Sequence, residues 1–175
     1  MKVRSCVLVL AAVALSGCDD DPNEPSNRLE EHFGAIMNSS NEVSPPVAIT
    51  SSATGTAALR VVSRRADAAS AFAPETLYYT LTYSGLTDST KGAHIHGPAS
   101  STQNASVILN FAPPTTTFTS YSASGTVPGT LAVPAIGLDS LVKLFRAQQS
   151  YVNVHSKTYT AGEIRGQVVP LTVPD

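Results

Sequence analysis

The heptapeptide LYYTLTY, residues 77–83, has the spacing of a β-strand, with Leu or Tyr at every other position and mostly Thr between them. Successive side chains of a strand point to opposite faces of its sheet, so this spacing predicts a strand with one face toward a core. The expected buried face carries Leu77, Tyr79, Leu81 and Tyr83. The opposite face carries Tyr78, Thr80 and Thr82.

Further short strands are predicted on both sides of this stretch. They cover residues 55–62, 92–97, 106–111, 151–155 and 164–169. Turns that contain Gly or Pro separate them, at residues 84–85, 97–98, 112–114, 127–129 and 161–162. On 151–155, Val152 and Val154 would point inward if Asn153 and His155 face out.

One stretch has helical rather than strand spacing. Its apolar residues are Leu138, Leu141, Val142 and Phe145. Asp139 or Ser140 could begin the helix, which would run to about residue 148. Several short strands and one helical crossover predict an all-β fold, an antiparallel Greek-key-like β-sandwich with one short helix.

The first residues resemble the export signal of a bacterial lipoprotein. Lys2 and Arg4 precede an apolar run at residues 7–15 that is too short for a membrane span of about 20 residues. The segment LSGC that ends at Cys18 resembles a lipobox, whose cysteine receives the lipid. We expect a signal peptide over residues 1–17, a flexible tether over 18–31 and a folded domain over 32–175. This organisation implies a lipid-anchored protein of the bacterial cell envelope, in either the inner or the outer membrane.

Charge and cysteine content exclude several function classes. Eleven Lys and Arg nearly balance thirteen Asp and Glu, and no basic stripe is present, so no nucleic-acid partner is expected. The two cysteines are Cys6 and Cys18, which leaves the domain no thiol for a disulfide, an iron–sulfur cluster or a nucleophile. No Gly-x-Ser-x-Gly elbow, carboxylate pair or Gly-rich phosphate loop stands out. Enzyme function would depend on histidines alone, and a binding or structural role with an unknown partner is the default expectation.

Several sequence blocks resemble the CHRD domain, the module named for chordin. They lie at residues 42–47 with 54–57, at 92–99 (GAHIHGPA), at 151–156 (YVNVHS) and at 162–168 (GEIRGQV), in the order that the family has. The resemblance runs from about residue 33 to residue 170 and implies an extracytoplasmic β-domain. It implies no activity, because most bacterial members have none established and the growth-factor antagonism of chordin does not carry over. The link at 156–161 differs from the shorter one of many members.

His94 and His96 are the most chemically suggestive pair. Residues two apart on a strand point to the same face about 6.5–7 Å apart, so two imidazoles could converge on one ion. His155 lies on another predicted strand and could supply a third nitrogen. Three neutral imidazoles suit Cu(II) or Zn(II), so His94, His96 and His155 are the predicted ligands of copper or zinc. The alternative is structural: the first two could brace the loop at Pro98, and the third could join Asn153 in a polar network.

The histidine strands also resemble the copper half of Cu/Zn superoxide dismutases, which are Greek-key sandwiches too. The resemblance rests on residues 92–96 and 154–155, and Arg165 falls near the place where that family's arginine guides superoxide. No histidine lies between His96 and His155, so a bridging ligand and a zinc loop are absent. The resemblance therefore implies a mononuclear site without the family's structural disulfide.

Glu163, Arg165 and Gln167 would share one face of a strand. A structural ion pair or a cross-strand brace is one reading of the first two. The other makes Arg165 an anion-steering group beside the histidines. Gly166, between them, predicts a bulge or a close approach of another backbone.

Overall fold

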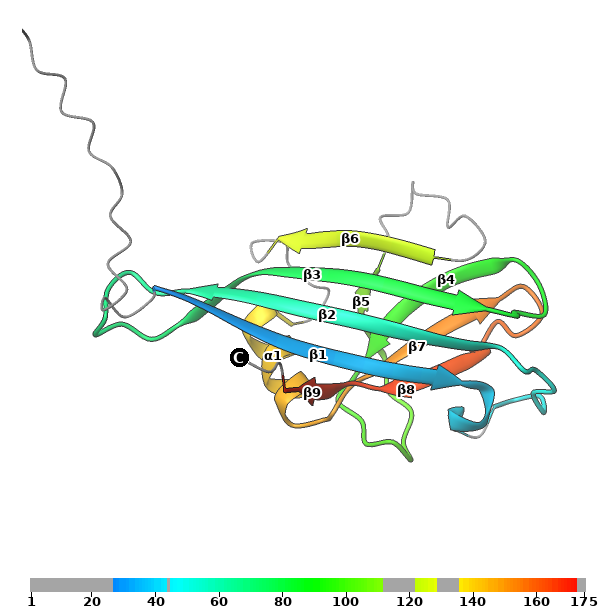
Figure 1. Ribbon diagram of the computed structural model, residues 1–175. Helices are drawn as coiled ribbons and strands as arrows, with labels where there is room; N and C mark the ends of the chain where they lie inside the picture. The colour runs from blue at the N-terminus through cyan, green and yellow to red at the C-terminus, as the bar shows by residue number, and fades with distance from the viewer. Residues whose placement is uncertain (1–26, 44, 112–121, 129–135, 173–175) are drawn as a thin grey trace, which may run out of the picture.

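Strands dominate the fold. The structure, a computed structural model, describes residues 27–43, 45–111, 122–128 and 136–172. Its elements, drawn in Figure 1, are β1 (Arg28–Asn38), the 3-10 turn η1 (Ser39–Asn41), β2 (Thr54–Arg64), β3 (Ala73–Ser84), β4 (Thr90–His96), β5 (Val107–Asn110), β6 (Ser122–Pro128), α1 (Leu138–Arg146), β7 (Tyr151–Ser156), β8 (Ile164–Gln167) and β9 (Val169–Leu171). Within these residues, the predicted all-β class with one short α-helix is confirmed.

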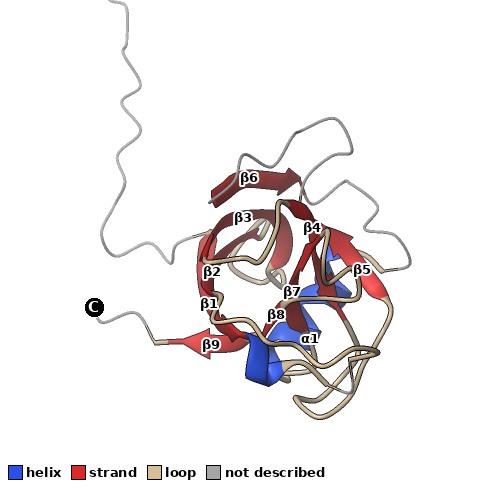
Figure 2. Cartoon of the chain, turned by 90° about the vertical axis from the view of Figure 1, so that its right-hand side faces the viewer, coloured by secondary structure: helices blue, strands red, loops and turns tan. Residues whose placement is uncertain are grey.

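The strands form one antiparallel sheet with two halves. The order is β5-β4-β7-β8-β1-β2-β3-β6, and β9 pairs with β1 beside this path. The halves meet at β8 and β1, where Asn38 and Arg165 form the register pair. Seen end-on, the sheet curls around the interior (Figure 2). Neighbours such as β4 and β7 are far apart in sequence, so the topology contains the crossovers of the predicted Greek-key-like arrangement.

The core lies inside the curl and follows the predicted alternation. On β3 the residues at 77, 79, 81 and 83 are buried, and those at 78, 80 and 82 are exposed. The inner faces of the neighbouring strands add Ala57, Leu59, Val61, Ile95, Val152, Val154 and Ile164. Burial of these apolar side chains is the main favourable term that holds the two halves together.

Helix α1 packs its apolar side into this core. It buries Leu138, Leu141, Val142 and Phe145, as the helical spacing predicted, and contacts β3 and β9. The ring of Phe145 lies 5.2 Å from that of Phe33 on β1, centroid to centroid. The helix begins at Leu138 after an extended Gly137 without a side-chain cap, and not at Asp139 or Ser140. The first residue of the helix is thus the buried Leu138.

The domain begins earlier than expected. Residues 28–31, which we placed in the tether, form the start of β1 and pair with residues 61–64 of β2. Their charged side chains find partners from other elements: Arg60 donates to Glu30 at 2.9 Å, and Arg146 forms an ion pair with Glu31 at 2.6 Å. The charged composition of this paired strand segment is thus the same as that expected of a tether.

The strand predicted over 164–169 consists of two. β8 pairs with β7, whereas β9 turns away and pairs with β1. Between them, the buried Val168 donates its backbone N–H to the carbonyl of Ser150 at 2.9 Å. Gly166 confirms the predicted close approach, because a Cβ there would collide with the backbone carbonyl of Ile36 on β1.

Several expectations fall on residues that the structure does not describe. The signal peptide over 1–17, the anchor Cys18 and the tether as far as residue 26 lie there, as do the turn at 112–114 and the end of the one at 127–129. Among the described helices, none has the length and apolar character of a transmembrane segment.

Candidate metal centre

One half of the sheet carries a polar face opposite the core. His94, Asn153 and Arg165 form one row across β4, β7 and β8. His96, Tyr151 and Gln167 form the next row. Cross-strand partners project to the same side, so both rows lie on the face that Ile95 and Val152 leave free.

This polar face is covered rather than solvated. Asn153 and His155 do point away from Val152 and Val154, as predicted, but their exposed fractions are only 2% and 8%. His155 bonds to the carbonyl of Thr160, and Asn153 bonds to Glu42, so loops from two other parts of the chain lie over β7. Side chains that point out of the core are buried here because loops form a second layer.

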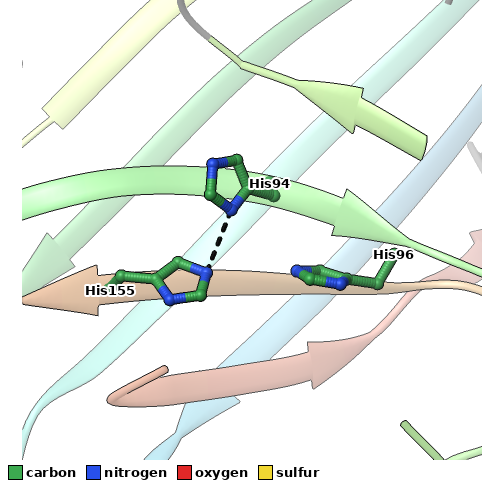
Figure 3. A group of neighbouring side chains, drawn as sticks. All are labelled: His94, His96 and His155. Atoms are coloured by element: carbon green, nitrogen blue, oxygen red, sulfur yellow. Dashed lines mark hydrogen bonds between the residues drawn. The ribbon is translucent and has the colours of Figure 1, made fainter. Parts of the chain in front are cut away.

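His94, His96 and His155 come together on this face (Figure 3). Nδ1 of His94 lies 3.0 Å from Nε2 of His155, and one ring nitrogen from each residue lies within 4.8 Å of the others. The ring of His96 faces the same space, 5.8 Å from that of His94. The predicted convergence of the three side chains is thus present.

Local sequence explains why the rings fit. Gly92 lies opposite His155 in the β4–β7 register, two residues before His94. A Cβ at this glycine would lie 3.3 Å from Nε2 of His94. Glycine therefore leaves room for the imidazole of His94 on this face.

Backbone carbonyls orient two of the three rings. Nδ1 of His96 lies 2.9 Å from the carbonyl of Ala105, and Nδ1 of His155 lies 3.0 Å from that of Thr160. A carbonyl only accepts, so each Nδ1 carries the proton and each Nε2 carries a lone pair. Metal-binding histidines usually have such a partner on the second nitrogen. His94 can donate from Nδ1 to Nε2 of His155, so these two nitrogens are hydrogen-bonded to each other.

Nε2 of His96 differs from the other nitrogens. It is buried, and no described residue forms a hydrogen bond with it. A buried polar atom without a partner costs about 1–3 kcal/mol. This lone pair is therefore available for a group that the protein itself does not provide.

Burial keeps the three imidazoles neutral. It lowers the pKa of His155 from 6.5 to about 4, with a further contribution from the neighbouring His94. The pKa of His94 is lowered by burial and then by His96. Burial also lowers the pKa of His96; the bond to the Ala105 carbonyl opposes this, and the charge of Arg165 adds to it. A neutral imidazole is the form that binds a metal, so at pH 7 the proton that His94 donates to His155 would only have to move to Nε2 of His94.

The distances suit an ion after a small adjustment. Two nitrogens bound to one tetrahedral zinc at about 2.0–2.1 Å lie about 3.4 Å apart. The separation of 3.0 Å between His94 and His155 would have to open slightly, and His96 would have to move inward if it lies at the limit of 4.8 Å. Shifts of this size are within the reach of side-chain rotation.

Glu163 and Arg165 act as braces for different loops. Oε1 of Glu163 accepts from Ser51 at 2.6 Å and from the Thr87 backbone at 2.8 Å. Burial raises the pKa of this carboxyl, but hydrogen bonds from Ser156, Ser51 and Thr87 outweigh it and hold the pKa below its usual value. Among the described ion pairs, none joins Glu163 to Arg165. The ion-pair reading is therefore wrong, and the hydrogen bonds of these two side chains brace loops rather than neighbouring strands.

Arg165 does not face solvent. Its exposed fraction is 1%, and its guanidinium donates to Asn104 Oδ1 at 2.9 Å, to the Gln103 carbonyl at 2.7 Å and to the Ser100 carbonyl at 3.1 Å. An arginine that guides anions from solvent needs an exposed guanidinium. The burial of Arg165 corrects the anion-steering reading.

Sequence reasoning missed Glu42 and Tyr151. Burial raises the pKa of Glu42 to about 7, against the lowering effects of Asn153 and Arg165. This carboxyl lines a pocket of about 700 Å³ beside Arg165 and Gln167. Tyr151 could have been found, because it alternates with 153 and 155 on the same strand face. Glu42 carried no such signal, since its contact with β7 spans more than a hundred residues.

Comparison with known proteins gives one match. The family model described as the CHRD domain matches residues 33–168, a range that contains all the blocks quoted above. No curated protein and no solved structure matches the chain.

Proposed function

The chain belongs to the CHRD-domain family, and from that premise we propose that its domain is a lipid-anchored binding module outside the cytoplasm that holds one copper or zinc ion through His94, His96 and His155. The observation that carries the metal is the buried, unpartnered Nε2 of His96, on a residue that has a ring nitrogen within 4.8 Å of ring nitrogens of His94 and His155. Three neutral nitrogen donors without a thiolate favour Cu(II) or Zn(II) over harder ions.

Structural histidines would give a different pattern. A histidine that only braces a loop has both ring nitrogens bonded within the protein. His155 meets this criterion, because its two nitrogens face Thr160 and His94. His96 does not meet it, because its Nε2 has no partner among the described residues. Its Nδ1, bonded to the carbonyl of Ala105, holds the ring in place. The group therefore fits a site whose last partner is a bound ion.

Metal binding is tested on protein stripped with a chelator. We expect calorimetric titration with Zn(II) or Cu(II) to give one ion per chain, and elemental analysis after dialysis to retain it. His96→Ala should abolish stoichiometric binding, because two imidazoles hold a divalent ion poorly. His32→Ala is the matched control, since His32 lies on β1 near Glu30 and outside the group. Absence of binding by the wild type, or equal binding by His96→Ala, would contradict the proposal.

Catalysis is not part of this proposal. The resemblance to superoxide dismutases gave Arg165 the anion-guiding role, and its burial removes the support for it. Superoxide turnover by the copper-loaded protein, lost in His96→Ala, would extend the function to an enzyme.

The proposed anchor rests on the sequence at Cys18 alone. We expect Cys18→Ala to release the protein from the membrane fraction or to block its processing, with mass spectrometry of the mature N-terminus as the readout. Separation of inner and outer membranes then identifies the compartment. A mature protein that starts elsewhere and carries no lipid would refute this part while leaving the metal site in place.

A further inference from the structure

The ring of His96 is stacked on an aromatic neighbour. Its centroid lies 4.8 Å from that of Tyr151, and the two planes differ by 2°. These residues are direct cross-strand partners on β4 and β7. The stack therefore fixes the plane of the imidazole.

A buried guanidinium lies against the same tyrosine. Cζ of Arg165 is 3.4 Å from the centroid of the Tyr151 ring. Because β7 lies between β4 and β8, the tyrosine stands between His96 on one strand and Arg165 on the other. A cation over an aromatic face is attracted to it, and the attraction is larger away from water.

The same guanidinium holds the loop that follows β4. Among the described residues, its three hydrogen bonds go to residues 100–104, which lead directly to Ala105. Ala105 accepts from Nδ1 of His96, and its backbone N–H lies 3.3 Å from the hydroxyl of Tyr151. Its acceptors among the described residues are an amide oxygen and two carbonyls, so its hydrogen bonds tie a loop, while its charge also acts on the carboxyl of Glu42.

We propose that Arg165 and Tyr151 are positioning residues of the metal centre: they hold the plane of His96 through the stack and its protonated nitrogen through the Ala105 loop. This inference rests on the proposed function, because positioning His96 serves metal binding. The positioning itself is a property of the metal-free protein. This role differs from a general structural one, because the Tyr151 stack and the Ala105 loop, which both support the ring of His96, depend on the guanidinium of Arg165.

The first experiment needs no metal. In ¹H–¹⁵N correlation spectra of the metal-free protein, His96 should be protonated on Nδ1. In Arg165→Met we expect a mixture of the two tautomers, and in Arg165→Lys a partial return, since lysine restores the charge without the planar fork. Arg60→Met is the matched control, because Arg60 lies 4.2 Å over the ring of Tyr78 on another part of the sheet and should leave His96 unchanged.

A second pair of variants keeps the test decisive if Arg165→Met does not fold. Tyr151→Phe preserves the stack and should keep the Nδ1 tautomer of His96, whereas Tyr151→Leu removes the stack and should not. Wild-type protein with His96 protonated on Nε2 would overturn the inference. So would folded Arg165→Met or Tyr151→Leu variants whose His96 signals match the wild type.

The second experiment measures metal affinity. Loss of an outer partner of a ligand typically weakens binding about 10–100-fold, so Arg165→Met should bind Zn(II) that much more weakly than Arg60→Met. Equal affinities of these two variants would overturn the link between Arg165 and the ion. If the wild type binds no metal, the proposed function fails, and the tautomer of His96 still decides whether Arg165 positions it.

Discussion

Acidification should destabilise the metal-free protein through His155. In the unfolded chain this imidazole has its ordinary pKa of 6.5, whereas in the folded protein burial and the neighbouring His94 lower the pKa to about 4. Between these pH values the imidazole of His155 is protonated in the unfolded chain and neutral in the folded protein. The resulting loss of unfolding free energy is therefore absent above pH 6.5, grows as the pH falls, and levels off below about pH 4.

The magnitude follows from the difference between the two pKa values. A difference of about 2.5 units at 1.36 kcal/mol per unit corresponds to about 3 kcal/mol of lost unfolding free energy at full protonation. At pH 5 the loss is about 2 kcal/mol by the same relation. The small exposed fraction of His155 leaves little solvent to screen this effect.

Glu42 works in the opposite direction and must be separated from His155. Burial raises the pKa of its carboxyl from 4.5 to about 7. Its contribution to stability is fully present below pH 4.5 and is lost as the pH rises through 7. The two effects overlap between pH 4.5 and 6.5 and partly cancel, so the wild-type curve by itself does not isolate either residue.

The assay compares variants at each pH. Urea unfolding followed by circular dichroism, with chelator present, gives the unfolding free energy of the wild type and of His155→Gln from pH 7.5 to pH 4. We expect His155→Gln to gain about 3 kcal/mol relative to the wild type across this range. Glu42→Gln should show the opposite trend. A difference between wild type and His155→Gln that stays constant with pH would refute the reasoning.

Three further outcomes are expected from the packing and the site. Phe145→Ala should lower the unfolding free energy by about 3–5 kcal/mol, since its buried ring fills the core beneath β1; a loss below 1 kcal/mol would mean that the helix is not part of the cooperative core. Gly166→Ala should lower the unfolding free energy by about 1–3 kcal/mol or more, because the added Cβ meets a β1 carbonyl. Gly137→Ala, whose Cβ would enter open space, should lower it by less than about 1 kcal/mol. Zinc at 100 times its dissociation constant should raise the unfolding free energy by about 2.7 kcal/mol in the wild type, and His96→Ala should show no rise in the same denaturation assay.

Local periodicity predicted much of this fold. The alternation at residues 77–83 identified the buried face of β3, and the spacing of Leu138 to Phe145 identified the helix. Both succeed because the repeat of side-chain direction belongs to the element itself. The same rule placed His94 and His96 on one face. Composition was the weaker guide, because the charged residues 28–31, assigned to the tether, pair with β2 as part of β1.

The sequence by itself determined the helix, the shared face of His94 and His96, and the strands other than β1 and β6. Only the tertiary structure decided that β7 lies between β4 and β8, which brings His155 to that face and Tyr151 against His96. It also decided that loops cover the face, so that Arg165 is buried and Ala105 and Thr160 orient the imidazoles. The reason is physical: side-chain direction follows from one residue's neighbours in the chain, whereas strand order, loop cover and burial depend on contacts between distant segments.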